Sequence, residues 1–208
     1  TVELVRDAKE RGIDVTCEVT PHHLTLTENT LLGNTNGDSP FEPLTLSAYN
    51  THAKVNPPLR SREDVHAMVQ GLADGVIDLI ATDHAPHEPV SKRVTYHEAA
   101  FGISVLETAL GSSLQLVHSG RMSLNSLNER MTVGPARVLG AAFEELASLE
   151  PGTPADIVLF DPDAEWEVDP IKFESKGKNT PLKGTVLKGK VMATVVEGEV
   201  VYSDGLGI

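Results

Sequence analysis

The chain has 208 residues, and its 17 Lys and Arg against 30 Asp and Glu give a formal net charge of −13. This excess of negative charge excludes nucleic-acid binding by bulk charge. Hydrophobic residues make up 40% of the chain, as in a globular protein, and no apolar run approaches the ~20 residues that cross a bilayer. We therefore expect no nucleic-acid partner and no membrane partner. The single Cys17 excludes an internal disulfide framework.

The first half of the chain predicts two helices and one strand. Residues 1–11 have helical apolar spacing, and Gly12 is placed to end that helix. Residues 13–19 are short and rich in β-branched side chains, which predicts a strand buried on both faces. Residues 28–50 are rich in Gly, Asn, Pro and Ser and predict an irregular excursion. Ser61 is a good N-cap for an amphipathic helix that ends at Gly75.

The second half predicts a further strand and three helices before a change of texture. Residues 76–82 predict an apolar strand, and a polar loop of about eighteen residues then leads to a helix over 104–118. Two short helices follow, one capped by Ser123 and one with Pro135 near its start. After Pro151 the pattern is strand, with turns expected at 188–189 and 197–198. The order predicts two turns of a parallel α/β winding followed by a small β module.

The densest polar cluster is ATDHAPH (81–87), which directly follows the predicted strand 76–82. The carboxyl ends of parallel strands are where α/β active sites assemble. There Asp83 could bind a metal through oxygen and move a proton, and a nearby His could donate to a substrate carboxylate. The residue types alone favour the plainer interpretation, an Asp that caps the loop beside two solvated His side chains.

Three further clusters have both a functional and a plain interpretation. In VNPPLR (55–60) the paired prolines could hold the Asn56 amide toward a ligand, or the segment could be an ordinary turn. Phe101 and Gly102 precede a helix whose backbone N–H groups could bind an anion or a carbonyl, or they could simply pack. His22 and His23 are adjacent and therefore seldom ligate one metal, so a buried, hydrogen-bonded His is the better interpretation.

Six segments resemble the bacterial dihydroorotases of the amidohydrolase superfamily, in the same order along the chain. They are EVTPHHL (18–24), KVNPPLRSREDV (54–65), IDLIATDHAPH (77–87), AFGISVLETAL (100–110), GTPADIVLFD (152–161) and NTPLKG (179–184). The resemblance covers the chain apart from the 28–50 excursion, which looks like an insertion. The joint occurrence of ATDHAPH and VNPPLR is its most specific part.

The resemblance implies an α/β fold, namely the C-terminal part of a metal-dependent (β/α)8 TIM barrel plus a small β-sandwich module. Residues 1–145 would form the last two β/α units of the barrel with the helices that follow, and residues 146–208 would form the C-terminal part of the accessory module. Two strands cannot close a barrel, which needs eight.

The resemblance also implies zinc-dependent, reversible hydrolysis of the cyclic amide of dihydroorotate to N-carbamoyl-L-aspartate, a step of pyrimidine synthesis. Asp83 would be a zinc ligand and would pass a proton from the attacking water to the leaving ring nitrogen. Asn56 and His87 would bind substrate, with His87 near its carboxylate. Phe101 and Gly102 would contact the ring through the backbone.

Most of the family's metal ligands have no counterpart in this sequence, which lacks the His-x-His pair, the bridging Asp or carboxylated Lys and two further His. A catalytic zinc takes three or more protein ligands, so Asp83 alone cannot hold one. We expect one or two zinc ions whose other ligands lie in an absent N-terminal half, and a 208-residue chain that is inactive alone. The expected partners are that half or another copy, with a homodimer or an association with aspartate transcarbamoylase also open.

Two alternatives to this function stay open at the level of the sequence. One is another cyclic amidohydrolase, a hydantoinase or an allantoinase, against which Asn56 and His87 argue because both suit an acidic substrate. The other is a non-catalytic dihydroorotase-like subunit that scaffolds aspartate transcarbamoylase. The chain begins without an initiator Met or a signal-peptide core, and we expect a cytoplasmic protein.

Overall fold

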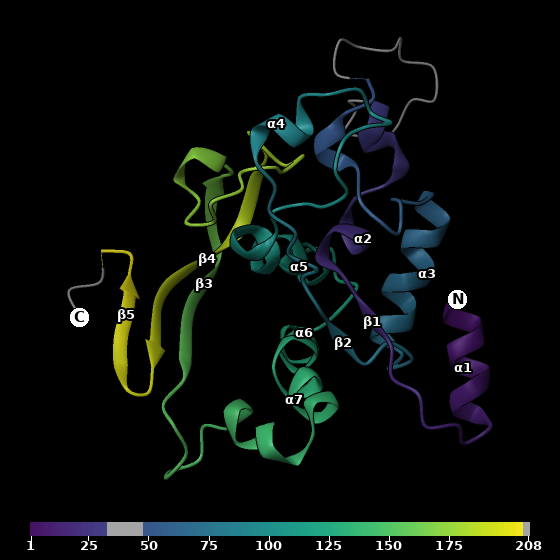
Figure 1. The fold of residues 1–208 in the computed structure, drawn as a ribbon. Helices are drawn as coiled ribbons and strands as arrows, with labels where there is room; N and C mark the ends of the chain where they lie inside the picture. Colours follow the sequence, from purple (N-terminus) through teal and green to yellow (C-terminus); the bar gives the residue numbers. More distant parts are fainter. Residues whose placement is uncertain (33–47, 206–208) are drawn as a thin grey trace.

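A computed structural model describes residues 1–32 and 48–205 of the chain as an α/β unit with an antiparallel sheet at one side (Figure 1). Its α-helices are α1 Val2–Glu10, α2 Pro21–Thr25, α3 Arg62–Ala73, α4 Pro89–Lys92, α5 Ala109–His118, α6 Leu124–Met131 and α7 Val133–Leu139. Its 3-10 helices are η1 Glu28–Leu32, η2 Thr51–Ala53, η3 Leu106–Thr108, η4 Ala141–Ala147 and η5 Pro170–Lys172. Its strands are β1 Glu18–Val19, β2 Leu79–Ile80, β3 Ile157–Glu167, β4 Val186–Val196 and β5 Glu199–Ser203.

The predicted helix boundaries agree with the local capping chemistry. The Ser61 hydroxyl accepts a hydrogen bond from the Asp64 N–H at 3.3 Å, and Ser123 accepts one from the Ser126 N–H at 3.0 Å. Gly12 and Gly75 follow α1 and α3 with φ angles of +74° and +79°, a conformation that favours glycine. The helices predicted at 1–11, at 61–75, after Ser123 and around Pro135 are therefore confirmed.

The two parallel strands are shorter than predicted. β1 and β2 pair in parallel, with Glu18 opposite Leu79 and Val19 opposite Ile80. The prediction that residues 13–19 are buried on both faces is wrong, because Ile13 is 48% exposed and Glu18 is exposed. The Cys17 N–H donates to the Asp78 carboxylate at 2.8 Å rather than to a strand carbonyl, so the ladder begins only at Glu18.

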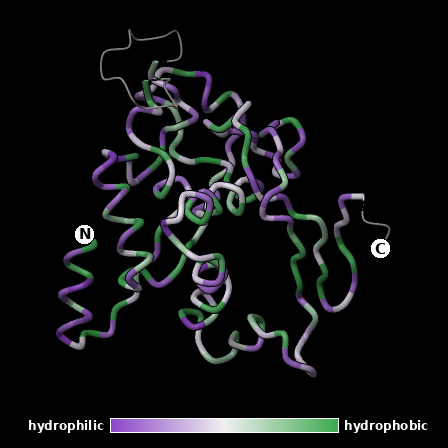
Figure 2. The backbone as a smooth tube through the Cα atoms, turned by 180° about the vertical axis from the view of Figure 1, so that it is seen from behind, coloured by the Kyte–Doolittle hydropathy of each residue, from purple (hydrophilic) through white to green (hydrophobic). Residues whose placement is uncertain are grey.

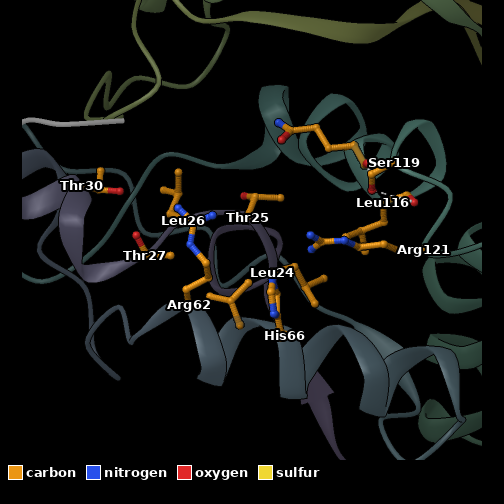
Figure 3. Close-up of a pocket in the computed structure, with 12 residues that line it drawn as sticks. Leu24, Thr25, Leu26, Thr27, Thr30, Arg62, His66, Leu116, Ser119 and Arg121 are labelled. Carbon is orange, nitrogen blue, oxygen red and sulfur yellow. Dashed lines mark hydrogen bonds between the residues drawn. The ribbon is translucent and has the colours of Figure 1, made fainter. Parts of the chain in front are cut away.

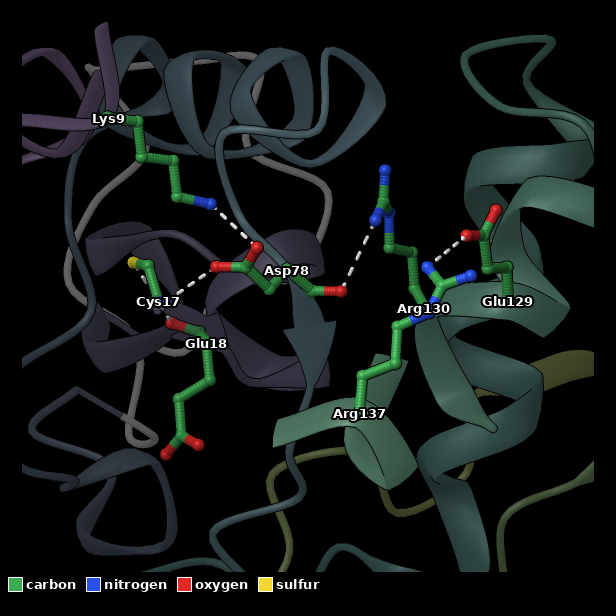
Figure 4. Close-up of polar contacts among 7 residues, drawn as sticks. All are labelled: Lys9, Cys17, Glu18, Asp78, Glu129, Arg130 and Arg137. Carbon is green, nitrogen blue, oxygen red and sulfur yellow. Dashed lines mark hydrogen bonds and ion pairs between the residues drawn. The ribbon is translucent and has the colours of Figure 1, made fainter. Parts of the chain in front are cut away.

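Asp78 ties together the N-terminal ends of these strands (Figure 4). One carboxylate oxygen is 2.6 Å from the Lys9 ammonium, and the other accepts the Cys17 N–H. The backbone carbonyl of Asp78 accepts a hydrogen bond from Arg130 at 3.3 Å. One residue thus connects α1, the approach to β1 and α6.

The loop after β2 returns to lie beside it. His84 and Ile103 form an isolated parallel bridge, and the Ala85 N–H donates to the Ile103 carbonyl at 3.0 Å. The loop itself contains α4. The helix expected from residue 104 begins instead as η3 and becomes α-helical at Ala109.

The strands β3, β4 and β5 form an antiparallel sheet in that order. The turn predicted at Glu197 and Gly198 is confirmed, and both residues have positive φ angles, +51° and +85°. The turn predicted at 188–189 is wrong, because both residues lie inside β4. Gly189 serves close packing instead, since a Cβ at that position would overlap the Leu114 side chain of α5.

Two apolar clusters form the core. One joins β1 and β2 to α3, α5 and α6 through side chains such as Leu72 and Leu114, and the other joins the 53–59 segment and the 103–109 segment to the antiparallel sheet. On the sheet, side chains such as Val158 and Val201 are exposed, and Figure 2 shows hydrophobic stretches along these outlying strands.

The insertion predicted at 28–50 lies only partly within the described residues. Residues 33–47, most of the expected insertion at 28–50, lie outside them. The division at 145/146 into barrel part and module stays a prediction. Within 1–32 and 48–205, no helix has the length and apolar character to cross a bilayer.

Candidate active site

Asp83 lies just past the C-terminal end of β2, on the exposed edge of the parallel pair. Its φ angle is +46°, a backbone conformation that is uncommon for a residue with a side chain, although Asp adopts it more readily than most. Its carboxylate accepts no hydrogen bond from the described residues, in contrast to the carboxylate of Asp78 at the other end of the same strand. The carboxylate is therefore free to act on a ligand.

His84 anchors the backbone directly after Asp83. Its Nδ1 accepts the N–H groups of Val105 and Leu106 at 3.0 and 3.1 Å, so the ring proton must sit on Nε2. Nε2 is 3.3 Å from the Ser175 hydroxyl, to which it donates. This anchoring role of His84 leaves no signal in the sequence, because its two donors come from residues 21 and 22 positions further along the chain.

Glu107 ends this chain of contacts. Its Oε1 accepts the Ser175 N–H at 2.8 Å. Burial acts to raise the pKa of Glu107, but hydrogen bonds from Ser175 and from the Glu107 backbone, with a contribution from His84, together outweigh it and leave the pKa below its usual value. The carboxylate is therefore ionised and holds Ser175 against His84.

His87 contacts the 101–102 segment directly. Its Nε2 is 2.7 Å from the Phe101 carbonyl oxygen, and because a carbonyl only accepts, Nε2 carries a proton and donates it. To donate also to a substrate carboxylate, the ring would need a second proton on Nδ1. The imidazolium form of His87 is thus the form suited to an acidic ligand.

Gly102 packs against the backbone that carries His87. A Cβ at Gly102 would lie 2.5 Å from the Ala85 Cβ and 3.0 Å from His87 Nε2, so no larger residue fits. Its N–H donates to the Lys54 carbonyl at 2.9 Å, and its carbonyl accepts the Asn179 amide at 2.9 Å. The Gly102 N–H is therefore already engaged inside the protein.

Asn56 lies close to the 101–103 segment, because it follows Lys54 by two residues. The Lys54–Gly102 hydrogen bond joins the 53–56 segment to the 101–103 segment. His23, on α2 after β1, is 2.9 Å through Nε2 from the Pro57 carbonyl, and it donates there. The Asn56 side chain is exposed. Three segments that are far apart in sequence thus converge on the edge that carries Asp83.

Two buried lysines lie under this edge. Lys92 is only 2% exposed, and its ammonium donates to the carbonyls of Ala100, Thr51 and Lys54 at 2.6, 3.1 and 3.3 Å. Burial, and then the charge of Lys54, lower the pKa of Lys92 to about 8, which leaves it a cation at neutral pH. The Lys54 ammonium donates to the His97 carbonyl at 2.8 Å and lies 4.3 Å from the Phe101 ring centre. Both cations were missed in the sequence, where single lysines carry no motif.

His22 and His23 are both buried, as the sequence predicted, but only one is hydrogen-bonded. His23 is bonded through both ring nitrogens, to Thr20 at 2.7 Å and to Pro57. His22 is 4% exposed, and neither of its ring nitrogens has a hydrogen-bond partner in the described part of the chain. Burial, and then the neighbouring His23, lower the pKa of His22 to about 3, so it is neutral at physiological pH.

Two cavities lie away from these residues. One of about 260 Å³ lies between α2, α3 and the end of α5, with Arg62, His66 and Arg121 at its wall (Figure 3). The other, of about 320 Å³, lies between α5 and the antiparallel sheet beside Trp166 and Phe173. Neither includes any of the predicted site residues.

The predicted zinc site is incomplete in the residues that the structure describes. Among residues 1–32 and 48–205, no three His, Cys, Asp or Glu side chains gather closely enough to hold a metal ion. Asp83 could supply one oxygen ligand, and a catalytic zinc takes three or more. The described residues therefore do not form a complete metal centre.

Comparison with known proteins gives consistent results. The model of the amidohydrolase family matches residues 6–201. A dihydroorotase of Geobacter sp. (strain M21) is 46% identical over 205 residues, 99% of this chain and 44% of the relative. A dihydroorotase of Pelotomaculum thermopropionicum is 49% identical, again over 205 residues, 98% of this chain and 44% of the relative. The chain thus spans less than half the length of these curated relatives.

Solved structures agree on the fold. The L-hydantoinase (dihydropyrimidinase) from Arthrobacter aurescens superimposes with a TM-score of 0.85 at 32% identity, covering 99% of this chain and 43% of that one. A D-hydantoinase gives a TM-score of 0.82 at 25% identity, with 98% and 43% covered. The α/β fold predicted from the sequence, part of a (β/α)8 barrel with an added β module, is confirmed.

Proposed function

The chain belongs to the amidohydrolase family, and on that basis we propose that it is part of a dihydroorotase. The reaction would be the reversible hydrolysis of the cyclic amide of dihydroorotate to N-carbamoyl-L-aspartate. The relatives at 46% and 49% identity support this choice of substrate, because both are dihydroorotases.

One observation carries the proposal: the predicted residues come from three segments that hydrogen bonds join at one edge. His87 reaches the Phe101 carbonyl at 2.7 Å, and Gly102 reaches the Lys54 carbonyl at 2.9 Å, two residues before Asn56. Asp83 lies at the same edge, exposed, and its carboxylate accepts no hydrogen bond from residues 1–32 or 48–205. An arrangement of this kind can hold a small polar ring between an acid–base group and several donors.

We assign the roles by chemistry. Asp83 would take a proton from the attacking water and return it to the ring nitrogen that leaves, which one carboxylate can do in both directions. His87 as an imidazolium and the Asn56 amide would bind the acidic substrate. The cations Lys92 and Lys54 would make the potential at this edge positive, in a chain whose net charge of −13 opposes an anion. Phe101 and Gly102 would border the ring.

Metal binding forms part of the proposal. A zinc ion would polarise the scissile carbonyl and assist ionisation of water, with Asp83 as one ligand. The other ligands would come from outside the residues described in the structure, in the part of the relatives that this chain does not match. The proposed partners are that part of the protein, a second copy of the chain, and aspartate transcarbamoylase. The proposed compartment is the cytoplasm.

The proposal is tested in a chimera that joins the unmatched N-terminal part of the Geobacter relative to this chain. We expect the chimera to hydrolyse dihydroorotate and to leave hydantoin unchanged at the same enzyme concentration. Turnover of hydantoin alone would favour a hydantoinase, the class of the structural relatives. A chimera that binds zinc but turns over neither substrate would favour a non-catalytic scaffold.

A further inference from the structure

Asn179 connects the two backbone segments that border the proposed site. It follows η5 in the stretch before β4, and it is 2% exposed. Its Oδ1 accepts the His87 N–H at 2.6 Å. Its Nδ2 donates to the carbonyls of Gly102 and Ala85 at 2.9 and 3.3 Å.

The orientation of this amide follows from its partners. A backbone N–H can only donate and a carbonyl can only accept, so Oδ1 must face His87 and Nδ2 must face Gly102 and Ala85. Both amide protons and one oxygen lone pair are therefore used. The backbone carbonyl of Asn179 adds a fourth bond, accepting the Ser104 N–H at 2.8 Å.

No other common side chain reproduces this set of contacts. Aspartate keeps the acceptor but loses both donors, and alanine loses all three side-chain bonds. The adjoining backbone is equally constrained, because a Cβ at Gly177 would lie 2.5 Å from the backbone nitrogen of His87. The stretch 177–179 is thus fitted closely against 85–87 and 102.

We propose that Asn179 is a positioning residue, which fixes His87 and Gly102 relative to each other and so sets substrate affinity. This rests on the proposed function, in which His87 and Gly102 border the substrate. Asn179 itself does not reach the proposed reacting atoms. Asp83 is held by a different set of contacts, those of His84 with Val105, Leu106 and Ser175. Loss of Asn179 should therefore affect binding more than the chemical step.

Hydrogen exchange in the 208-residue protein tests the contacts without reference to activity. In Asn179→Ala we expect the His87 amide to exchange at least about 10-fold faster, while the Ser104 amide keeps its protection because its acceptor is a backbone carbonyl. In Asn179→Asp the His87 amide should keep its protection, and the Gly102 amide should lose protection as its segment is released. Unchanged protection of His87 in Asn179→Ala would overturn the proposal.

Kinetics of the chimera test the consequence. We expect both Asn179 variants to raise KM for dihydroorotate at least about 10-fold with kcat within about 3-fold, because binding groups are displaced and the proton-transfer group is not. The control Asn125→Ala, an exposed position on α6, should leave both constants unchanged. A fall in kcat with unchanged KM would overturn the positioning role.

The outcomes separate the two proposals. If the parent chimera fails to hydrolyse dihydroorotate while His87 exchange behaves as expected, the proposed function fails and the contact role of Asn179 stands. If the parent is active and both variants have normal KM, the positioning role fails alone. Should Asn179→Ala not fold, Asn179→Asp decides, since it keeps the acceptor and the side-chain volume.

Discussion

The two ends of the β1–β2 pair use the same residue types in opposite ways. At the N-terminal ends, the Asp78 carboxylate accepts hydrogen bonds from the Lys9 ammonium and the Cys17 N–H. At the C-terminal ends, the Asp83 carboxylate is exposed and unbonded within the described chain, while the backbone that follows it is held by the contacts of His84 with Val105 and Leu106. Asp78 therefore stabilises the fold through its own side chain, whereas the position of Asp83 is fixed by hydrogen bonds of its neighbours, which leaves its carboxylate available for chemistry.

The largest effect is expected when the free carboxylate is removed. In the chimera, Asp83→Asn should lower kcat about 100- to 10,000-fold, the usual contribution of acid–base catalysis. Metal content per protein, measured by mass spectrometry, should fall with it. Asp78→Asn provides the matched control, and its turnover per folded molecule should be unchanged. Near-normal activity of Asp83→Asn would end the distinction between the two strand ends.

A second large effect concerns the buried cation behind the site edge. Lys92→Met keeps the length of the side chain but removes the donor of the Ala100 carbonyl and one of the two donors of the Thr51 and Lys54 carbonyls, and we expect a loss of about 1–3 kcal/mol in the free energy of unfolding. Urea denaturation measures this loss. The exposed Lys183→Met should change stability by less than about 0.5 kcal/mol. A loss no larger than that control would show that the carbonyls find other partners.

The pH dependence of stability should report His22. Its pKa is about 3 in the fold against 6.5 normally, so the unfolded chain binds the extra proton between these values. The contribution is complete above about pH 6.5 and is lost as the pH falls toward 3, by about 2 kcal/mol from pH 7 to pH 5.

His22→Phe removes this proton site without removing a hydrogen bond to any described residue, because neither ring nitrogen has a partner among them. Denaturation at about pH 7 and pH 5 should therefore show about 2 kcal/mol less acid sensitivity than in the parent. The exposed His66→Gln should retain the sensitivity of the parent. Equal acid sensitivity of His22→Phe and the parent would contradict a neutral, buried His22.

The smallest effect is expected at the N-terminal ends of β1 and β2. Asp78→Asn weakens a half-exposed ion pair with Lys9 and the acceptor for Cys17, and it should lower the free energy of unfolding by about 1 kcal/mol. High salt should reduce the difference, because part of it is ionic. A loss as large as that of Lys92→Met would mean that both ends are held with equal strength.

Local chemistry explains which elements the sequence predicts well. Ser61, Ser123, Gly12 and Gly75 act within one helical turn of themselves, so the helices they begin or end are visible in sequence. Gly189 looks like a turn glycine in the sequence, yet it lies within a strand. Glycine is needed there because the Leu114 side chain, 75 positions earlier, leaves no room for a Cβ. Local pattern cannot distinguish a bend from a close contact.

The same limit applies to the candidate site. Asp83 and His87 follow a strand and are recognisable from that position alone. Asn179, Lys92 and His84 act through partners far along the chain or through backbone carbonyls, and neither leaves a spacing pattern. The residues that would touch a substrate are therefore easier to predict than the residues that hold them in place.

The fit between α5 and β4 bears on engineering by recombination. Gly111 and Gly189 face each other across this seam: a Cβ at Gly111 would lie 3.2 Å from the Leu187 Cβ, and the Gly189 carbonyl also accepts the Trp166 indole N–H at 2.9 Å. A crossover that takes the helix from one parent and the strand from another must keep both glycines together. Libraries of shuffled amidohydrolases should therefore be divided before α5 or after β4, so that the seam is inherited whole.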